Sequence, residues 1–182
     1  NVQGLGTAFQ KPVLTSLVTV LYRIAFQNVQ RVFFENEENA REFRERKILS
    51  ADRQVVLSGA GINLERYQMA PYPNHKRMHF LYLGRIMKEK GMDELFYTVR
   101  RLKKENEDFI LDLVGFFEEE YKDQVEELEN SGIAHFYGFQ SDPRMFYIEA
   151  DCVVLPSYHE GMSNVLLEAA ATGRPVITSN IS

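Results

Sequence analysis

From His79 onward, short apolar runs alternate with charged amphipathic segments, and this alternation restricts the folds open to the chain. The apolar runs predict strands, and the segments between them predict helices. The expected strands are residues 79–84, 108–115, 133–138, 152–156 and 175–179, and the expected helices are residues 91–106, 118–130, 142–150 and 163–172. Such alternation is typical of an α/β fold, in which helices cover both faces of a parallel sheet.

The first 60 residues alternate in the same way but are set apart from the later array. They predict a helix at residues 12–29, a strand at 31–35, a helix at 36–47 and a strand at 54–59. The irregular stretch that follows contains Pro71 and Pro73. We therefore predict an incomplete α/β domain at residues 1–60, an interdomain linker at 61–77 and a second domain at 78–182.

Composition narrows the ligands that the chain can hold. The formal net charge of -5 gives no general attraction to nucleic acid, so an anionic ligand needs a local basic site. The four histidines lack the spacing of metal ligands, and the one cysteine, Cys152, lies in an apolar run that predicts burial. The apolar segment at residues 12–26 falls short of the roughly 20 residues of a spanning helix.

Open α/β sheets bind ligands beyond the carboxyl ends of their strands, so candidate ligand-binding residues are expected in the turns there. The turn "GRIMKEKG" carries Arg85 and Lys90 close to an expected helix start. An arginine fork, a lysine and helix-start amides together favour a phosphate or diphosphate. Taken alone, this stretch slightly favours a solvated basic turn over an anion site.

Glu168 lies within the otherwise apolar run from Val165 to Ala171, where an unpaired carboxylate is costly. Hydroxyls of a bound polyol would satisfy it, and so would an ion pair with an arginine or lysine elsewhere in the chain. Eight residues earlier, Glu160 lies in the turn "SYHEGMSN", where Ser163 is a suitable N-cap for the next helix. Taken singly, an ion pair for Glu168 and an ordinary loop acid for Glu160 are favoured.

Several motifs in order resemble the retaining glycosyltransferases of family 4, which have the two-domain GT-B fold. They are the "GRIMKEKG" turn, "LVGFF" at residues 113–117, "FYGF" at 136–139 and "ADCVVLPSYHEGMSNVLLEAAATGRPVI" at 150–177, which contains the family's pair of glutamates. The resemblance is dense over residues 76–182 and extends more weakly back to about residue 30. Ala60 departs from the proline-asparagine character of the family's linker.

The resemblance implies a role for each matching position. Arg85 and Lys90 would hold the donor diphosphate and act electrophilically, Glu168 would accept the ribose hydroxyls, and Glu160 would contact the transferred sugar. The amides of Gly161, Met162 and Ser163 would approach that sugar, and those of Asn164 and Val165 would face the phosphate. The base would lie near Gly115, Phe116 and the backbone of Phe139 and Gln140.

The implied activity is transfer of a hexosyl unit from a nucleotide diphosphate sugar, UDP- or GDP-linked, to a glycan or lipid-linked acceptor, with retention and without metal or cofactor. Bacterial surface polysaccharide synthesis in the cytoplasm, with peripheral association at the inner face of the membrane, is the implied setting. The missing part of the acceptor domain predicts weak nucleotide binding and little turnover. The alternatives are a nucleotide-sugar epimerase or phosphorylase of similar architecture and a non-catalytic nucleotide-binding domain.

Overall fold

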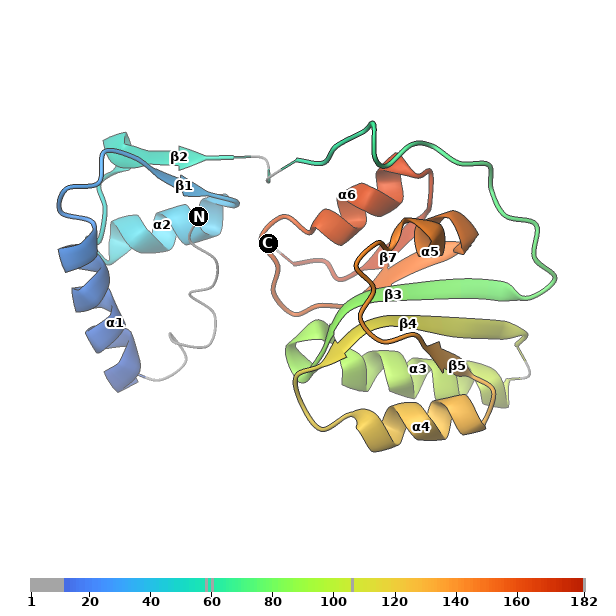
Figure 1. Cartoon of the computed structure of the whole chain (residues 1–182). Helices are drawn as coiled ribbons and strands as arrows, with labels where there is room; N and C mark the ends of the chain where they lie inside the picture. The colour runs from blue at the N-terminus through green and yellow to red at the C-terminus, as the bar shows by residue number, and fades with distance from the viewer. Residues whose placement is uncertain (1–11, 58, 60, 106, 182) are drawn as a thin grey trace. The chain divides into compact units, whose positions relative to one another are not determined.

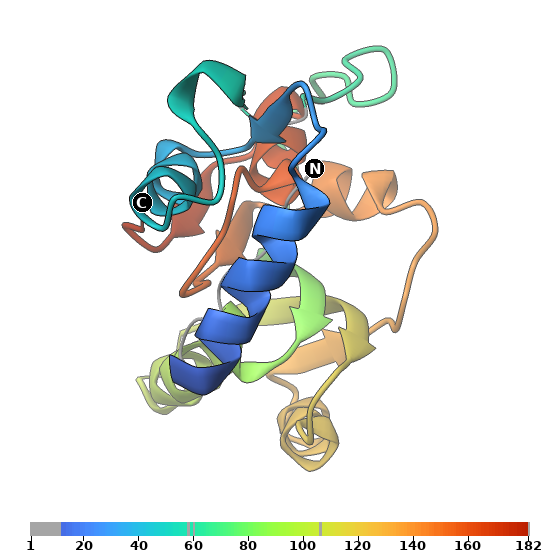
Figure 2. The same ribbon diagram turned by 90° about the vertical axis from the view of Figure 1, so that its left-hand side faces the viewer.

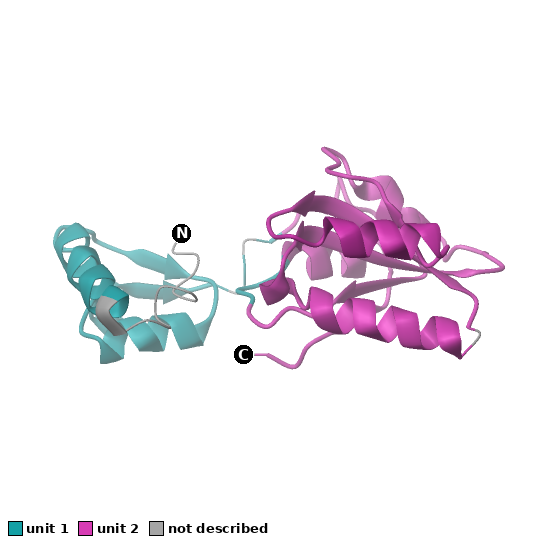
Figure 3. Ribbon diagram, turned by 90° about the horizontal axis from the view of Figure 1, so that it is seen from below, with its two compact units in different colours: residues 1–61, 160–163, 182 teal, residues 62–159, 164–181 magenta. Residues whose placement is uncertain are grey.

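The computed structural model describes residues 12–57, 59, 61–105 and 107–181 (Figure 1). The chain divides into two compact units (Figure 3). Unit 1 comprises residues 1–61 with residues 160–163 and 182, and unit 2 comprises residues 62–159 and 164–181. Residues 1–11, which open the sequence, lie outside the described residues.

Unit 1 is a small α/β assembly. It contains α1 (Pro12–Ala25), β1 (Val32–Phe34), α2 (Glu37–Glu45), a 3-10 turn (Ala51–Arg53) and β2 (Gln54–Val56), and its two strands are parallel. Asn36 starts α2, because its side chain accepts a hydrogen bond from the Asn39 amide at 2.8 Å. The hydrophobic core of this unit is Val32, Phe34, Ala40, Phe43, Ile48 and Leu49.

Helix α1, in dark blue in Figure 2, is shorter than the predicted helix at residues 12–29. Thr15 and Thr19 are buried on it, whereas Leu17, Leu21 and Ile24 are more than half exposed. Of the helices in the described part of the chain, none combines the length and apolar character needed to cross a membrane.

Unit 2 has a five-stranded parallel sheet in the order β5-β4-β3-β6-β7. The strands are β3 (Met78–Ile86), β4 (Phe109–Phe117), β5 (Ala134–Phe136), β6 (Cys152–Leu155) and β7 (Val176–Thr178). The helices are α3 (Met92–Lys104), α4 (Lys122–Asn130), α5 (Arg144–Glu149) and α6 (Asn164–Ala171), with a 3-10 turn at Lys88–Lys90. Helices α3 and α4 cover one face of the sheet, and α5 and α6 lie on the other (Figure 1). The prediction of a parallel α/β sheet with helices on both faces is confirmed.

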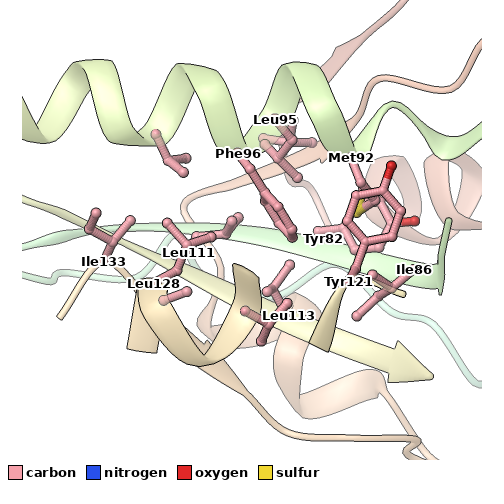
Figure 4. Close-up of a cluster of buried hydrophobic side chains, with 14 of the residues drawn as sticks. Tyr82, Ile86, Met92, Leu95, Phe96, Leu111, Leu113, Tyr121, Leu128 and Ile133 are labelled. Carbon is pink, nitrogen blue, oxygen red and sulfur yellow. The ribbon is translucent and has the colours of Figure 1, made fainter. Parts of the chain in front are cut away.

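Period-2 alternation along β3 distributes its side chains between two cores. Tyr82 and Ile86 enter the core beneath α3 and α4, together with Phe96 and Leu113 (Figure 4). Leu81 faces the opposite side and joins the core that contains α5 and α6. Arg85 is in phase with Leu81, so its side chain leaves β3 on the face of α5 and α6.

The irregular segment that begins at Ile62 packs on unit 2. The buried Arg174, which follows α6, donates from Nη2 to the carbonyls of Ala70 at 3.1 Å and Pro71 at 2.6 Å. The Ala70 amide donates to the carbonyl of Thr172 at 3.3 Å. The middle of the predicted linker is therefore fixed to the α6–β7 connection.

Candidate active site

The carboxyl ends of β3 and β6 form the topological switch point of the sheet. From β3 the chain continues to β4 and β5 on one side, and β6 and β7 lie on the other. In open α/β sheets this is where ligands bind. The turns after β3 and β6 touch here, since the Tyr158 amide donates to the Glu89 carbonyl at 2.9 Å.

Gly91 makes this close approach sterically feasible. Its φ is 74°, and a Cβ on it would lie 2.1 Å from the carbonyl oxygen of Pro156. An L side chain would clash with that carbonyl and would also disfavour the left-handed backbone. The second glycine of "GRIMKEKG" is therefore required by the contact between the two turns.

Arg85 belongs to β3, and not to the turn after it as the sequence predicted. The strand continues through Ile86 because Gly84 and Arg85 pair in register with Gly115 and Phe116 of β4. The Arg85 side chain is 47% exposed, and its Nη1 donates to Glu118 Oε2 at 2.7 Å. Lys90 ends the 3-10 turn after β3 and is partly buried. Arg85 thus lies near the carboxyl end of β3, and Lys90 lies in the turn that follows the same strand.

Phe116 and Phe139, predicted near the base, do lie together. Both are exposed, and their ring centroids are 6.4 Å apart in an edge-to-face arrangement. The Gly115 amide donates to the Gly138 carbonyl at 2.9 Å, so the end of β4 lies beside the segment that follows β5. The sheet edge therefore presents a solvent-accessible aromatic pair.

Glu168 lies in the second turn of α6 and is partly buried. Its Oε2 accepts a hydrogen bond of 2.6 Å from the hydroxyl of Tyr147 on α5. Within the described ranges, Glu168 forms no ion pair with an arginine or lysine. The partner that compensates the carboxylate is thus a neutral phenol, which the sequence analysis did not identify.

Tyr147 is fully buried. Burial first, and then the hydrogen bond to Glu168 and its charge, raise the pKa of the Tyr147 hydroxyl above its ordinary value. A buried tyrosine hydroxyl needs a hydrogen-bond partner. The tyrosine in the predicted helix at residues 142–150 was therefore the one sequence signal that could have pointed to this contact. Nothing local in the sequence indicates that the partner lies 21 residues away.

The remaining predicted residues surround the start of α6. The helix begins at Asn164 directly after Ser163, as predicted, with Val165 in its first turn. Ser163 is buried, Glu160 is partly buried, and Gly161, Met162 and Asn164 are exposed. Residues 160–163 group with unit 1, whereas Asn164 and Val165 belong to unit 2.

The described part of the chain contains no group of three or more histidine, cysteine, aspartate and glutamate side chains arranged to hold a metal ion. Cys152 is buried, as its apolar context predicts.

Residues 66–182 match the family model described as "Glycosyl transferases group 1". The chain is 30% identical over 196 residues to N,N'-diacetylbacillosaminyl-diphospho-undecaprenol alpha-1,3-N-acetylgalactosaminyltransferase of Campylobacter jejuni, covering 98% of this chain and 51% of that protein. This chain thus spans about half the length of that relative.

Solved structures share the fold. WaaG, a glycosyltransferase involved in lipopolysaccharide biosynthesis, aligns with a TM-score of 0.73 and 21% identity over 100% of this chain and 55% of its own. Anabaena HepE in complex with UDP and glucose aligns with a TM-score of 0.69 and 19% identity over 89% of this chain and 48% of its own. The sheet of unit 2, its switch point and the family match lead to one assignment: the chain belongs to the group 1 glycosyltransferases, as the motifs predicted.

Proposed function

We propose that the chain is part of a retaining glycosyltransferase that transfers a hexosyl unit from a nucleoside diphosphate sugar to a glycan or lipid-linked acceptor. The observation that carries the proposal is Glu168, a partly buried carboxylate near the start of α6 that is held by a phenol and, within the described part of the chain, by no cation. A carboxylate in such a place can accept hydrogen bonds from ligand hydroxyls. Glu168 is about 6 Å along the helix axis from Asn164 at a rise of 1.5 Å per residue.

Each part of the donor has residues that suit its chemistry. Phe116 and Phe139, beside Gly115, offer an aromatic surface to the base. Arg85 and Lys90 supply positive charge for the diphosphate, and Glu168 accepts from the ribose hydroxyls. The sugar is assigned to Glu160 and to the amides of residues 161–163, and the amides of Asn164 and Val165 are assigned to the phosphate.

The chemistry follows from these charges. When the bond between sugar and diphosphate breaks, negative charge grows on the leaving oxygen. Arg85 and Lys90 stabilise that charge without a metal, as preorganised cations and amides do in other transferase and hydrolase sites. The protein therefore acts mainly by positioning the donor and stabilising its leaving group.

The donor base and the acceptor are assigned by analogy. HepE was solved with UDP, and the Campylobacter relative is named for an undecaprenol-linked acceptor, so we assign UDP or GDP as the nucleotide and a lipid-linked oligosaccharide as the acceptor. Such an acceptor places the enzyme at the cytoplasmic face of the membrane in surface polysaccharide synthesis. Flotation with liposomes tests this assignment, and absence of the protein from the lipid fraction would refute it.

Calorimetric titration with uridine and guanosine diphosphates tests the donor site. We expect Arg85→Ala to weaken binding by roughly 1.5 to 3 kcal/mol, the range for a hydrogen bond to a charged group. Arg100→Ala is the matched control, because Arg100 on α3 pairs with Glu127 at 2.7 Å just as Arg85 pairs with Glu118. Equal affinities in both variants would remove Arg85 from the donor site.

A further inference from the structure

Glu168 is one of the functional residues proposed above, but the residues that hold it belong to other segments. Tyr147 comes from α5, and Tyr67 comes from the irregular segment before β3. The two tyrosine rings meet edge to face with centroids 6.0 Å apart, and both join the core that contains α5 and α6. Two segments distant in sequence from α6 thus converge on its carboxylate, because Tyr67 also interacts with Glu168.

We propose that Tyr147, supported by Tyr67, is a positioning residue that fixes the Glu168 carboxylate for the ribose of the donor nucleotide. The inference rests on the proposed function and adds to it the residues that orient the acid. The short hydrogen bond of 2.6 Å between the Tyr147 hydroxyl and Glu168 Oε2 defines the orientation. Because Tyr147 is fully buried, its ring cannot turn away without disrupting the core.

A phenol suits this task better than a cation. An ionised carboxylate has about four lone-pair sites, and one hydroxyl uses only one of them. An arginine would engage both oxygens in a bidentate pair and neutralise the charge. Tyr147 therefore restrains Glu168 and leaves it able to accept from two neighbouring ribose hydroxyls.

The surroundings keep both phenols protonated. Burial and the negative charge of Glu168 raise the pKa of Tyr67 as well as that of Tyr147. Both hydroxyls therefore stay donors throughout the physiological pH range. The orientation of Glu168 does not depend on a proton that is lost near neutral pH.

The test separates ribose recognition from general nucleotide binding. The 182-residue chain is titrated with uridine diphosphate and with its 2',3'-dideoxy analogue, or with the guanosine pair if the chain selects that base. The affinity for the ribose form divided by the affinity for the dideoxy analogue measures the contribution of the ribose hydroxyls. We expect Tyr147→Phe to lower this ratio by about threefold to tenfold, as expected for one lost hydrogen bond in the site. The affinity for the dideoxy analogue is expected to stay within about twofold.

Tyr121→Phe is the matched control. Tyr121 is also buried and donates to a carboxylate, Asp93 Oδ1, at 2.8 Å, but it lies on the other face of the sheet. We expect its affinity ratio to equal that of the unmodified chain. Tyr67→Phe is a second variant, and we expect it to lower the ratio less than Tyr147→Phe does. If Tyr147→Phe fails to fold, the ratio of Tyr67→Phe tests the positioning role: an unchanged ratio refutes it.

The outcomes distinguish this inference from the proposed function. If Glu168→Gln removes the preference for the ribose form while the folded tyrosine variants keep it, the positioning role is refuted and the ribose site stands. If the unmodified chain binds uridine and guanosine diphosphates but never prefers the ribose forms, Glu168 is not the ribose acceptor and both are refuted. A reduced ratio in the tyrosine variants alone supports the positioning role.

Discussion

At the scale of single residues, the compensation of Glu168 shows how a carboxylate persists in an apolar helix. Removing a carboxylate from water costs several kcal/mol unless hydrogen bonds replace its hydration. Here Tyr147 supplies one such bond, and partial exposure of Glu168 leaves the rest to solvent or ligand. Among the described residues, the carboxylate is thus accommodated by a hydroxyl donor and not by an arginine or lysine.

Gly91 permits a residue-level prediction about stability. We expect Gly91→Ala to lower the free energy of unfolding by about 3 kcal/mol, because the left-handed backbone costs about 1 kcal/mol and the clash with Pro156 adds a further overpacking term. Gly132→Ala is the control, since its φ is also positive at 68° but a Cβ there meets nothing within 4 Å. Urea unfolding measures both variants. Equal losses would show that the turns after β3 and β6 do not approach closely.

Glu118 allows a second prediction at this scale. Its carboxylate accepts a hydrogen bond from the Arg85 guanidinium, and we assign that guanidinium to the donor diphosphate. Glu118→Gln is therefore expected to raise the affinity for nucleoside diphosphate up to about fivefold, because an exposed pair is worth at most about 1 kcal/mol. Glu127→Gln, which breaks the Arg100 pair instead, should leave affinity unchanged. Weaker binding by Glu118→Gln would mean that the carboxylate helps to orient Arg85 for the ligand.

At the scale of elements, the hydrophobic alternation predicted every strand and helix of unit 2 within a few residues. The misses arise from contacts between distant segments. Strand β3 runs past Gly84 because it pairs with β4 through Ile86 and Phe117. Helix α4 begins at Lys122 and not at residue 118, where Glu118 and Glu119 instead contact Arg85 and the Lys88 amide.

For the candidate site too, the sequence predicts the residues in local motifs but not their distant partners. Its motifs name Arg85, Phe116, Phe139 and Glu168 from local patterns, and the contact between the Phe116 and Phe139 rings is an additional finding of the structure. The partners of Arg85 and Glu168 lie 33 and 21 residues away along the chain, so no local pattern indicates them. Register between strands and packing between α5 and α6 decide these contacts.

The link between α5 and α6 predicts sensitivity to alkaline pH. The pKa of Tyr147 is raised in the folded state above its ordinary value of 10.0, so the folded chain keeps a proton that the unfolded chain loses. Below pH 10 the tyrosine contributes its full stabilisation, and above it the free energy of unfolding decreases as pH rises. We expect Tyr147→Phe to reduce this decrease. Urea midpoints at pH 8, 9, 10 and 11 measure it, and parallel pH curves for both proteins would contradict the expectation.

At the scale of the whole molecule, the two units differ in how much apolar surface they bury. Among the described residues, the core of unit 1 has six buried hydrophobic side chains, whereas the core beneath α3 and α4 alone has sixteen. Unit 1 contains a two-stranded sheet, and two-stranded assemblies are marginally stable in water. Unit 2 has the size and layering of an independently folding domain.

This difference predicts that the units unfold separately. We expect amides of β1 and β2 to exchange with solvent at least about tenfold faster than those of β3 and β4, because local opening needs less free energy where fewer apolar contacts are broken. A shortened protein, residues 62–182, should unfold cooperatively in urea at the midpoint of the main transition of the full chain. Circular dichroism and hydrogen exchange measure these quantities. If the shortened protein fails to fold, or if all amides of the full chain exchange through one global opening, unit 1 is instead an integral part of the stability of unit 2.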